Sequence, residues 1–296
     1  MPISPPRALF AGLTTLDVIH QVERLPGANQ KIVAVDFCVA AGGPATNAAV
    51  AFAHLGGAAS LHTRLPEHPL TQLIRADLEA CHVQVTAQPG EGTPTTASIL
   101  VTQSTGERAV VSPSASAARA DRAPVPAPDV TGVGAVLLDG YHPEIAIPLA
   151  RAARAAAIPV LMDAGSRKPH TATIVRECDL VIASADLTDP SGSDDPADVF
   201  AWLLSLGVER AVITRGERPV LWRVPGASGE VAVAPVEVID TLGAGDVFHG
   251  ALAHRIAARG MDDARTAEDL AWACAAVAPA LASFGTRAWL ATAPAP

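Results

Sequence analysis

Asp246 stands in the stretch of this sequence whose residue types point most directly to chemistry. Segment 238–252 passes from a β-branched run through small residues into an amphipathic pattern, which predicts a strand, a tight turn and a helix start. Because Gly243 and Gly245 carry no side chain, amides of the first helical turn can converge on one point, where the helix dipole favours negative charge. The turn, which also contains Ala244, is therefore an expected anion-binding site.

A carboxylate inside an anion-binding site needs a reason. Asp246 would repel a phosphate-sized anion unless it has another task, and accepting the proton of an attacking hydroxyl group is such a task. The alternative is that Asp246 only caps the helix beside a tight turn. The G-x-G-D pattern taken by itself leaves both interpretations open.

A second candidate binding segment lies nearer the start of the chain. Gly42 and Gly43 precede a small-residue helix that is expected to end at Gly56-Gly57, and Asn47 places an amide group nearby. The glycine pair lets the backbone approach a ligand, and the amide can both donate and accept hydrogen bonds. A close joint between packed helices would use the same residues, so that interpretation also stays open.

Composition limits the class of protein. The 296 residues are 49% hydrophobic and 17% charged, which favours one large core with a small satellite. The net charge of −9 argues against a nucleic-acid or membrane surface. The longest apolar tract, 270–282, is too short to span a bilayer, and without a signal-peptide pattern we expect a cytoplasmic protein. The four cysteines lack metal or disulfide spacing and are expected to be ordinary buried thiols: Cys38, Cys81, Cys178 and Cys274.

Strands and helices alternate at short spacing through the middle of the chain, which predicts a parallel sheet covered on both faces. The expected strands are 8–13, 135–139, 160–163, 180–183 and 211–214. The expected helices are 71–81, 143–157 and 197–206, together with the small-residue helix that follows the glycine pair and runs through Leu55. Ligands of such sheets bind beyond the carboxyl ends of the strands. The residues expected to share that rim are Gly12, Asp139, Asp163, Ser184, Thr214 and the turn 240–246.

Two β-rich segments do not fit this alternation. They are expected to pair as a small sheet over the rim, with strands at 17–22, 31–39, 95–102 and 108–111 and a hairpin turn at 103–107. We therefore expect a single domain, 1–296, with a lid formed by about 14–40 and 92–112.

Both candidate binding segments match signatures of a known family. Asp240-Thr241-Leu242-Gly243-Ala244-Gly245-Asp246 resembles the D-T-x-G-A-G-D signature of the ribokinase-like (PfkB) carbohydrate kinases, and 42–47 resembles their G-G-x-x-x-N signature. The resemblance is collinear over nearly the whole chain. It implies an α/β fold, ribokinase-like, with a mostly parallel sheet flanked by helices on both faces and a small β lid. It also implies transfer of the γ-phosphoryl group of ATP to a sugar hydroxyl, with Mg²⁺.

The resemblance assigns roles residue by residue. Asp246 would be the general base, and the amides of Gly243, Ala244 and Gly245 would stabilise charge on the transferred group. The residues placed at the sugar would be Asp17, Gly42, Gly43 and Asn47, with Lys31 and Arg108 as further candidates. Those placed at the nucleotide would be Thr214 and Gly216 of a T-x-G loop, together with Asp240 and Thr241. Arg108 is equally compatible with a solvent-facing position, and a lysine on a lid strand, as expected for Lys31, is more often a solvated charge.

The sequence departs from the family pattern in places. Pro219 stands where the T-x-G loop usually carries another glycine, which predicts a stiffer loop. The family's acidic N-x-x-E element is not visible after the strand at 180–183, so the metal ligands stay unknown, with Asp186 or Asp189 as possible substitutes. Leu242 replaces a common threonine and is expected to cost nothing.

The substrate is less sharply defined. Residues 12–19 resemble ketohexokinases and 246–252 also resemble sulfofructose kinases, in which a lysine stands at the place of Lys31. Tyr141 stands where those sulfo-sugar kinases have an arginine, so our first expectation is a neutral or acidic ketose or another simple sugar. Nucleoside phosphorylation and a purely binding, regulatory role are the alternatives. A dinucleotide oxidoreductase is disfavoured because no G-x-G-x-x-G follows the first strand.

Several other residues carry mainly structural expectations. His249 and His254 have poor metal spacing and are expected to be structural. Asp163 and Arg167 resemble a D-x-x-x-R pattern seen in part of the family, yet a local ion pair is the simpler interpretation. The lid sheet, if exposed, could join two copies in a homodimer.

Overall fold

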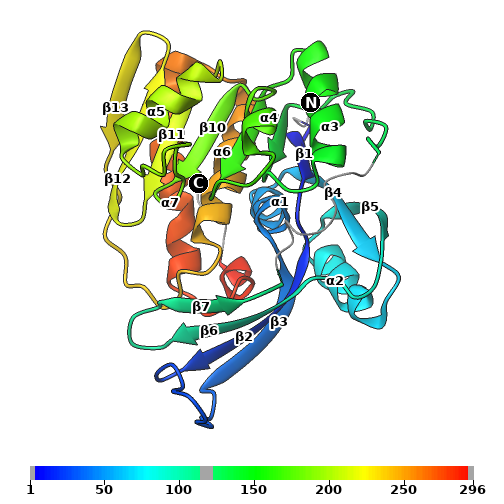
Figure 1. Cartoon of the computed structure of the whole chain (residues 1–296), viewed down its shortest axis with the longest axis vertical. Coiled ribbons are helices and arrows are strands. Elements are labelled where there is room, and N and C mark those ends of the chain that lie inside the picture. The colour runs from blue at the N-terminus through cyan, green and yellow to red at the C-terminus, as the bar shows by residue number, and fades with distance from the viewer. Residues whose placement is uncertain (1–3, 114–122, 293–296) are drawn as a thin grey trace.

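A large sheet covered by helices forms the body of the protein, and a smaller sheet projects from one end of it (Figure 1). The computed structural model describes residues 4–113 and 123–292. In the described residues the large sheet has the strand order β13-β12-β11-β10-β9-β8-β1-β4-β5. All neighbouring strands from β11 to β5 are parallel, and β12 and β13 add an antiparallel hairpin at one edge. The strands are β1 (Arg7–Ala11), β4 (Ala58–Pro66), β5 (Gln84–Gly90), β8 (Ala135–Leu138), β9 (Val160–Ala164), β10 (Leu180–Ser184), β11 (Arg210–Arg215), β12 (Arg218–Val224) and β13 (Ala227–Val231).

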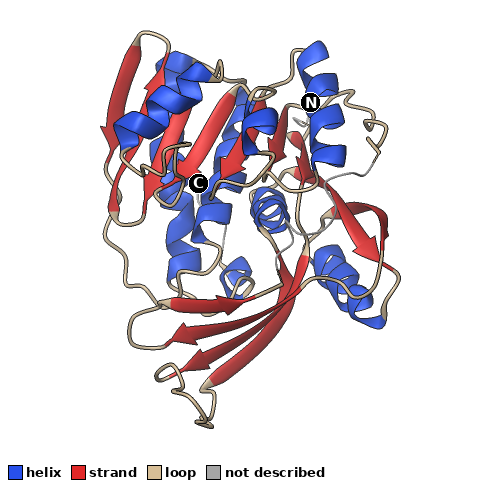
Figure 2. Ribbon diagram, in the orientation of Figure 1, coloured by secondary structure: helices blue, strands red, loops and turns tan. Residues whose placement is uncertain are grey.

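Helices bury both faces of this sheet (Figure 2). Successive strand residues point to opposite faces, so Phe10 packs into one hydrophobic cluster and its neighbours Leu9 and Ala11 into the other. The first cluster lies under α1 (Pro44–His54), α2 (Pro69–Ala80), α6 (Ala244–Arg259) and α7 (Thr266–Leu281). The second lies under α3 (Pro143–Ala155), α4 (Thr171–Val175) and α5 (Pro196–Ser205). Two short 3₁₀ turns, η2 (Asp263–Arg265) and η3 (Ala288–Ala291), flank α7.

The small sheet has the order β3-β2-β6-β7 and comes from two separate segments of the chain. Its strands are β2 (Thr15–Val22), β3 (Asp36–Gly42), β6 (Thr96–Thr102) and β7 (Arg108–Val111). The inner face buries Ile19, Ala97, Ile99 and Val101 against Leu242 and Phe284 of the body. The fold class predicted from the sequence is therefore confirmed, including the separate small sheet.

The structure corrects two predicted strands. Segment 31–35 is a loop, because Gln21 near the end of β2 pairs with Asp36 and leaves 23–35 to connect the two strands. Segment 238–240 is also a loop, in which the amides of Ile239 and Asp240 donate to the carbonyl oxygen of Leu281 at the end of α7.

Strands β4, β5, β12 and β13 were missing from the sequence prediction. In β4 the polar residues His62, Thr63 and Arg64 interrupt the apolar pattern, yet His62 and Thr63 are buried beside neighbouring strands. The predicted helices are present with small shifts at their ends. None of the helices in the described part of the chain has the length and apolar character that a membrane span needs.

Candidate active site

The turn before α6 has the geometry expected of an anion site. Gly243 is the N-cap residue of α6 and has a φ of 75°, a left-handed conformation that suits glycine. No side chain caps the helix, and the amides of its first turn have no acceptor within the helix. The amides of Gly245 and Asp246 therefore lie at the positive dipole end of α6, and the amide of Ala244 beside them donates to the carbonyl oxygen of Thr241 over 3.4 Å.

Asp246 is a partner of Asn47 and does not cap its helix. The amide Nδ2 of Asn47 donates to Asp246 Oδ2 over 2.8 Å, which joins α1 to α6. Burial and the nearby Asp163 carboxylate raise the pKa of Asp246 to about 7, against the opposing effects of Asn47, His249 and Arg108. A carboxylate with a pKa near neutrality is well matched to accept a proton.

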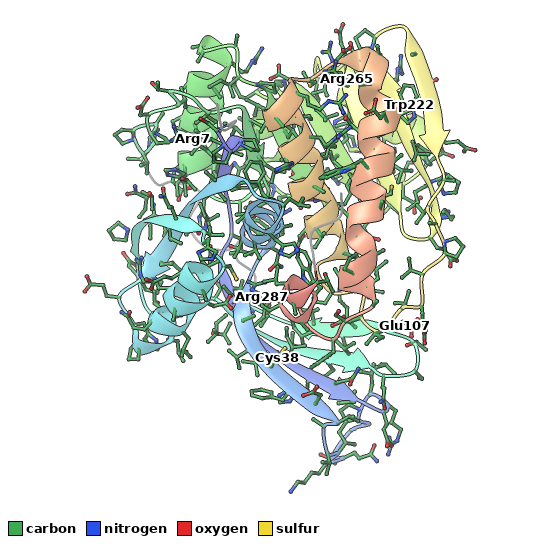
Figure 3. All side chains as sticks on the ribbon, turned by 180° about the vertical axis from the view of Figure 1, so that it is seen from behind. Arg7, Cys38, Glu107, Trp222, Arg265 and Arg287 are labelled. Carbon is green, nitrogen blue, oxygen red and sulfur yellow. The ribbon has the colours of Figure 1, made fainter. Side chains whose placement is uncertain are left out.

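Arg287 fixes the orientation of the Asn47 amide. Its Nη1 donates to Asn47 Oδ1 over 3.2 Å, its Nη2 donates to the carbonyl oxygen of Ala41, and Nε and Nη2 both contact Asp77 Oδ2. Figure 3 shows Arg287 close to where the small sheet leaves the body, with Cys38 just below it. Arg287 is not among the residues predicted from the sequence, because a single arginine after Gly285 offers no periodic or spacing signal.

Asp17 lies at the root of the small sheet against the glycine pair. It is buried, its Oδ1 accepts a hydrogen bond from the Thr15 hydroxyl over 2.6 Å, and burial raises its pKa against the effects of Thr15 and Arg287. A Cβ atom on Gly42 would lie 1.9 Å from Asp17 Oδ2. A Cβ on Gly43, whose φ is 100°, would lie 2.3 Å from the carbonyl oxygen of Leu13. The glycine pair is therefore a tight packing joint, and it also borders the space near Asp17 and Asn47.

Asp139 organises the rim at the carboxyl end of β8. Its Oδ2 accepts hydrogen bonds from the amides of Leu13 and Ala45, and its Oδ1 accepts one from the amide of Tyr141. Gly12 leaves the room for this carboxyl group, because a Cβ there would lie 2.1 Å from it. Asp139 is thus a buried structural centre that holds the ends of β1, β8 and α1 together.

Hydrogen bonds join the small sheet to the turn 240–246, which we call the anion turn. Thr241 Oγ1 donates to the carbonyl oxygen of Gly106 over 2.9 Å, and Arg108 Nη1 donates to Thr241 Oγ1 over 3.1 Å. Arg108 therefore reaches the turn from the β6–β7 hairpin. Lys31 is exposed in the loop between β2 and β3, at the opposite end of these strands from Asp17 and Gly42.

Asp240 holds the anion turn to the end of the chain. Its Oδ1 accepts a hydrogen bond from the amide of Leu242 and its Oδ2 accepts one from the amide of Gly285, both over 2.8 Å. This buried carboxylate therefore holds the backbone of Leu242, the residue that directly precedes Gly243.

The predicted nucleotide loop lies between β11 and β12. Thr214 is half-buried near the end of β11, and Gly216 is exposed with a φ of 64°. The guanidinium group of Arg215 donates two hydrogen bonds to the carbonyl oxygen of Pro219. This bracing of the loop supports the expected stiffness.

A buried pair beside Asp246 also escaped the sequence analysis. His249 Nδ1 lies 3.1 Å from Asp163 Oδ2, and both side chains are buried. The local pair expected between Asp163 and Arg167 is wrong, because Asp163 faces His249 and Arg167 is exposed. One turn of α6 separates Asp246 from His249, so the sequence spacing predicts that both side chains lie on the same face of the helix. The spacing does not predict that β9 brings Asp163 next to His249.

The carboxylates of the site do not match a dedicated magnesium site. Asp163, Asp246 and His249 each offer one ligating atom within 4.8 Å of the others, but imidazole suits transition metals, whereas Mg²⁺ prefers oxygen ligands and water. We assign none of the three as a magnesium ligand. Asp189 Oδ1 is taken up by hydrogen bonds from Ser191 and Ser193, and Asp186 is exposed after β10.

Known proteins share this fold. A putative ribokinase from Agrobacterium tumefaciens aligns with a TM-score of 0.83 at 24% identity, covering 98% of this chain and 95% of that one. The structure of Arabidopsis thaliana ribokinase complexed with ribose and ATP aligns with a TM-score of 0.75 at 24% identity, covering 98% and 100% of the two chains. The architecture is thus that of the ribokinase-like proteins.

The family follows from the sequence match. Residues 6–288 match the model of the pfkB family carbohydrate kinases, and the chain belongs to this family. An Arabidopsis thaliana protein named ribokinase is 25% identical over 266 residues, which are 84% of this chain and 70% of that protein. The resemblance carried by segments 240–246 and 42–47 is confirmed. The closer likeness to ketohexokinases stays a prediction.

Proposed function

We propose that this carbohydrate kinase transfers the γ-phosphoryl group of ATP to a hydroxyl group of a small sugar, with Asp246 as the general base. The observation that carries the proposal is the Asp246 carboxylate at the amide-rich start of α6, held by Asn47. Asp246 would take the proton of the attacking hydroxyl group, and the amides of Gly243, Ala244 and Gly245 would stabilise charge on the transferred group.

An ADP-release screen tests this proposal. Purified enzyme would be supplied with ATP, Mg²⁺ and, one at a time, ketoses, aldoses, sugar acids, sulfo-sugars and nucleosides. We expect sugar-dependent release of ADP with at least one sugar. Binding of ATP without ADP release for any acceptor would favour the regulatory alternative, and release with nucleosides alone would favour a nucleoside kinase.

We propose that the nucleotide lies along the loops after β10 and β11. Thr214 and Gly216 would contact the phosphates, while Asp240 and Thr241 would hold the turn on which those phosphates rest. Mg²⁺ would enter with ATP, held mainly by its phosphate oxygens and water, which agrees with the small number of suitable protein ligands.

We propose that the sugar lies between Asp17, the Gly42-Gly43 pair and Asn47. Asp17 offers Oδ2 to a sugar hydroxyl group, because the hydrogen bond from Thr15 goes to Oδ1. Arg108 closes this space from the hairpin. The distant loop position of Lys31 favours the solvent-facing interpretation of that residue.

Asp17→Ala should raise KM for the sugar by about 10- to 100-fold with a smaller change in kcat, the range expected for a lost hydrogen bond to a charged group. Steady-state kinetics at varied sugar and saturating ATP would measure it. Glu23→Gln, an exposed acid just beyond β2, is the matched control and should leave KM unchanged. An unchanged KM in Asp17→Ala would refute the assigned contact.

The outer face of the small sheet offers a surface for a homodimer. Phe37, Val39 and Val111 are 53%, 40% and 75% exposed, and the strand register puts them on the face opposite Ile19. We propose that a second copy covers this face, because an apolar, extended sheet surface is costly to leave in water.

Phe37→Glu should therefore convert a dimer to a monomer, as measured by sedimentation velocity. Leu204→Glu, which also alters an exposed leucine but on α5, is the control and should stay dimeric. A monomeric wild-type protein would contradict the proposal.

We place the enzyme in the cytoplasm, where ATP is available and where its four free cysteines would stay reduced.

A further inference from the structure

The Asp163–His249 pair, defined by the contact between these two side chains, lies beside the proposed base. His249 follows Asp246 by three residues on α6, so both side chains leave the same face of the helix. His249 is only 5% exposed, and its Nδ1 lies 3.1 Å from Asp163 Oδ2 on β9. Within the described residues, neither ring nitrogen has a partner with hydrogen-bond geometry. A buried imidazole with no other polar contact requires an electrostatic reason.

The three side chains form one charged cluster. A ligating atom from each of Asp163, Asp246 and His249 lies within 4.8 Å of the others. Two carboxylates this close in a buried site cannot both stay ionised without a nearby cation, because each disfavours the charge of the other. The imidazole of His249 is the basic group that the fold places beside both carboxylates.

The remaining groups near the cluster supply less charge. Arg108 approaches from β7 but bonds to Thr241. Burial raises the pKa of the Tyr141 phenol to about 12, so Tyr141 is neutral, and Asn47 offers an uncharged amide. Burial opposes a charge on His249, but the Asp163 and Asp246 carboxylates outweigh it and raise the pKa of the ring.

We propose that His249, held by Asp163, is a positioning residue whose positive charge keeps Asp246 ionised and ready to accept the proton of the sugar hydroxyl group. This inference rests on the proposed role of Asp246 as the base. Without the imidazolium, the two facing carboxylates would share a proton, and a base that already carries a proton cannot take another.

The pH dependence of kcat in a set of variants tests the inference. In His249→Gln, the acid limb of the kcat profile should move up by about one pH unit, which lowers kcat about tenfold at pH 6 and leaves it within about twofold at pH 9. Adding Asp163→Asn in the same chain removes the second carboxylate and should move the limb back toward the wild-type position. A role in packing alone would make the double variant worse at every pH.

His254→Gln is the matched control. His254 lies on the same helix and is also partly shielded, but its ring packs against Phe52 and Trp272, away from Asp246. Its acid limb should match the wild type. An unmoved limb in His249→Gln, or a double variant with no recovery at pH 6, would overturn the inference. A limb that moves after the wild type has been treated with EDTA and returned to excess Mg²⁺ would overturn it as well, because it would identify a bound transition metal in place of the proton.

A second measurement separates this inference from the proposed function. The ring ¹⁵N shifts of His249 in the wild-type protein should show a protonated imidazole at pH 7, and a neutral ring would refute the inference even if His249→Gln failed to fold. Asp246→Asn decides the function independently. If that variant keeps its turnover, the base assignment fails; if it is inactive while the His249→Gln limb stays in place, only the present inference fails.

Discussion

Asp246→Asn is expected to lower kcat at least about 100-fold, the scale of a lost general base. The amide cannot accept a proton, but its oxygen can still accept the hydrogen bond from Asn47. The anion turn before α6 is unchanged, so affinity for ATP should be roughly kept. Single-turnover kinetics and nucleotide titration would measure the two quantities, and normal turnover would remove Asp246 from the mechanism.

The same variant should be more stable than the wild type. Burial and Asp163 raise the pKa of Asp246 from 3.8 to about 7 in the folded protein. A carboxyl group with a raised pKa binds its proton more tightly when folded, so it lowers the stability increasingly as pH rises from 3.8 to about 7. Replacing it by an amide should recover up to about 4 kcal/mol at pH 8.

Thermal unfolding at two pH values tests this part of the prediction. The Tm of Asp246→Asn should exceed that of the wild type at pH 8, and the difference should shrink as the pH falls and vanish below 3.8, where the wild-type carboxyl group becomes protonated in the unfolded state as well. A Tm difference that does not depend on pH would contradict the assigned cost of burying the charge. Gain of stability with loss of activity is the pattern expected of a functional group held in an unfavourable environment.

Gly250→Ala is expected to lower the free energy of unfolding by about 2 kcal/mol or more, the scale of overpacking in a tight core. A Cβ atom at this position would lie 2.3 Å from the carbonyl oxygen of Ala48 and 2.8 Å from the Cβ of Ala51. Both contacts are with α1, so the added methyl group must push α1 away from α6. Alanine's better helix propensity offsets only about 1 kcal/mol.

Activity should fall with stability in this variant. Asn47 precedes Ala48 on α1, so separating the helices lengthens its 2.8 Å hydrogen bond to Asp246. Gly245→Ala is the stability control, because it lies in α6 with no heavy atom within 4 Å of its added Cβ. Urea unfolding should show a loss for Gly250→Ala alone. Equal stability of the two variants would contradict the prediction, because it would mean that α1 and α6 move apart without a loss in the free energy of unfolding.

Local patterns explain why so much of the fold could be predicted. Strands such as β8 and β9 are short apolar runs bounded by polar or turn residues, and each pattern fits within a few neighbouring positions. The predicted strand at 238–240 failed for a reason that is not local: its neighbour in space is the end of α7, which offers the single carbonyl oxygen of Leu281 and no strand.

The sequence by itself determined the chemistry proposed for the turn 240–246, since Gly243, Gly245 and Asp246 lie within four positions of the chain and their geometry follows from how a helix begins. Only the tertiary structure decided what surrounds Asp246. Asn47 lies 199 positions away, and Arg287, which holds Asn47, lies 240 positions from it. Asp163 reaches His249 of α6 from strand β9. These contacts depend on the packing of α1, α6, β9 and the end of the chain, and no spacing in the sequence encodes such long-range distances.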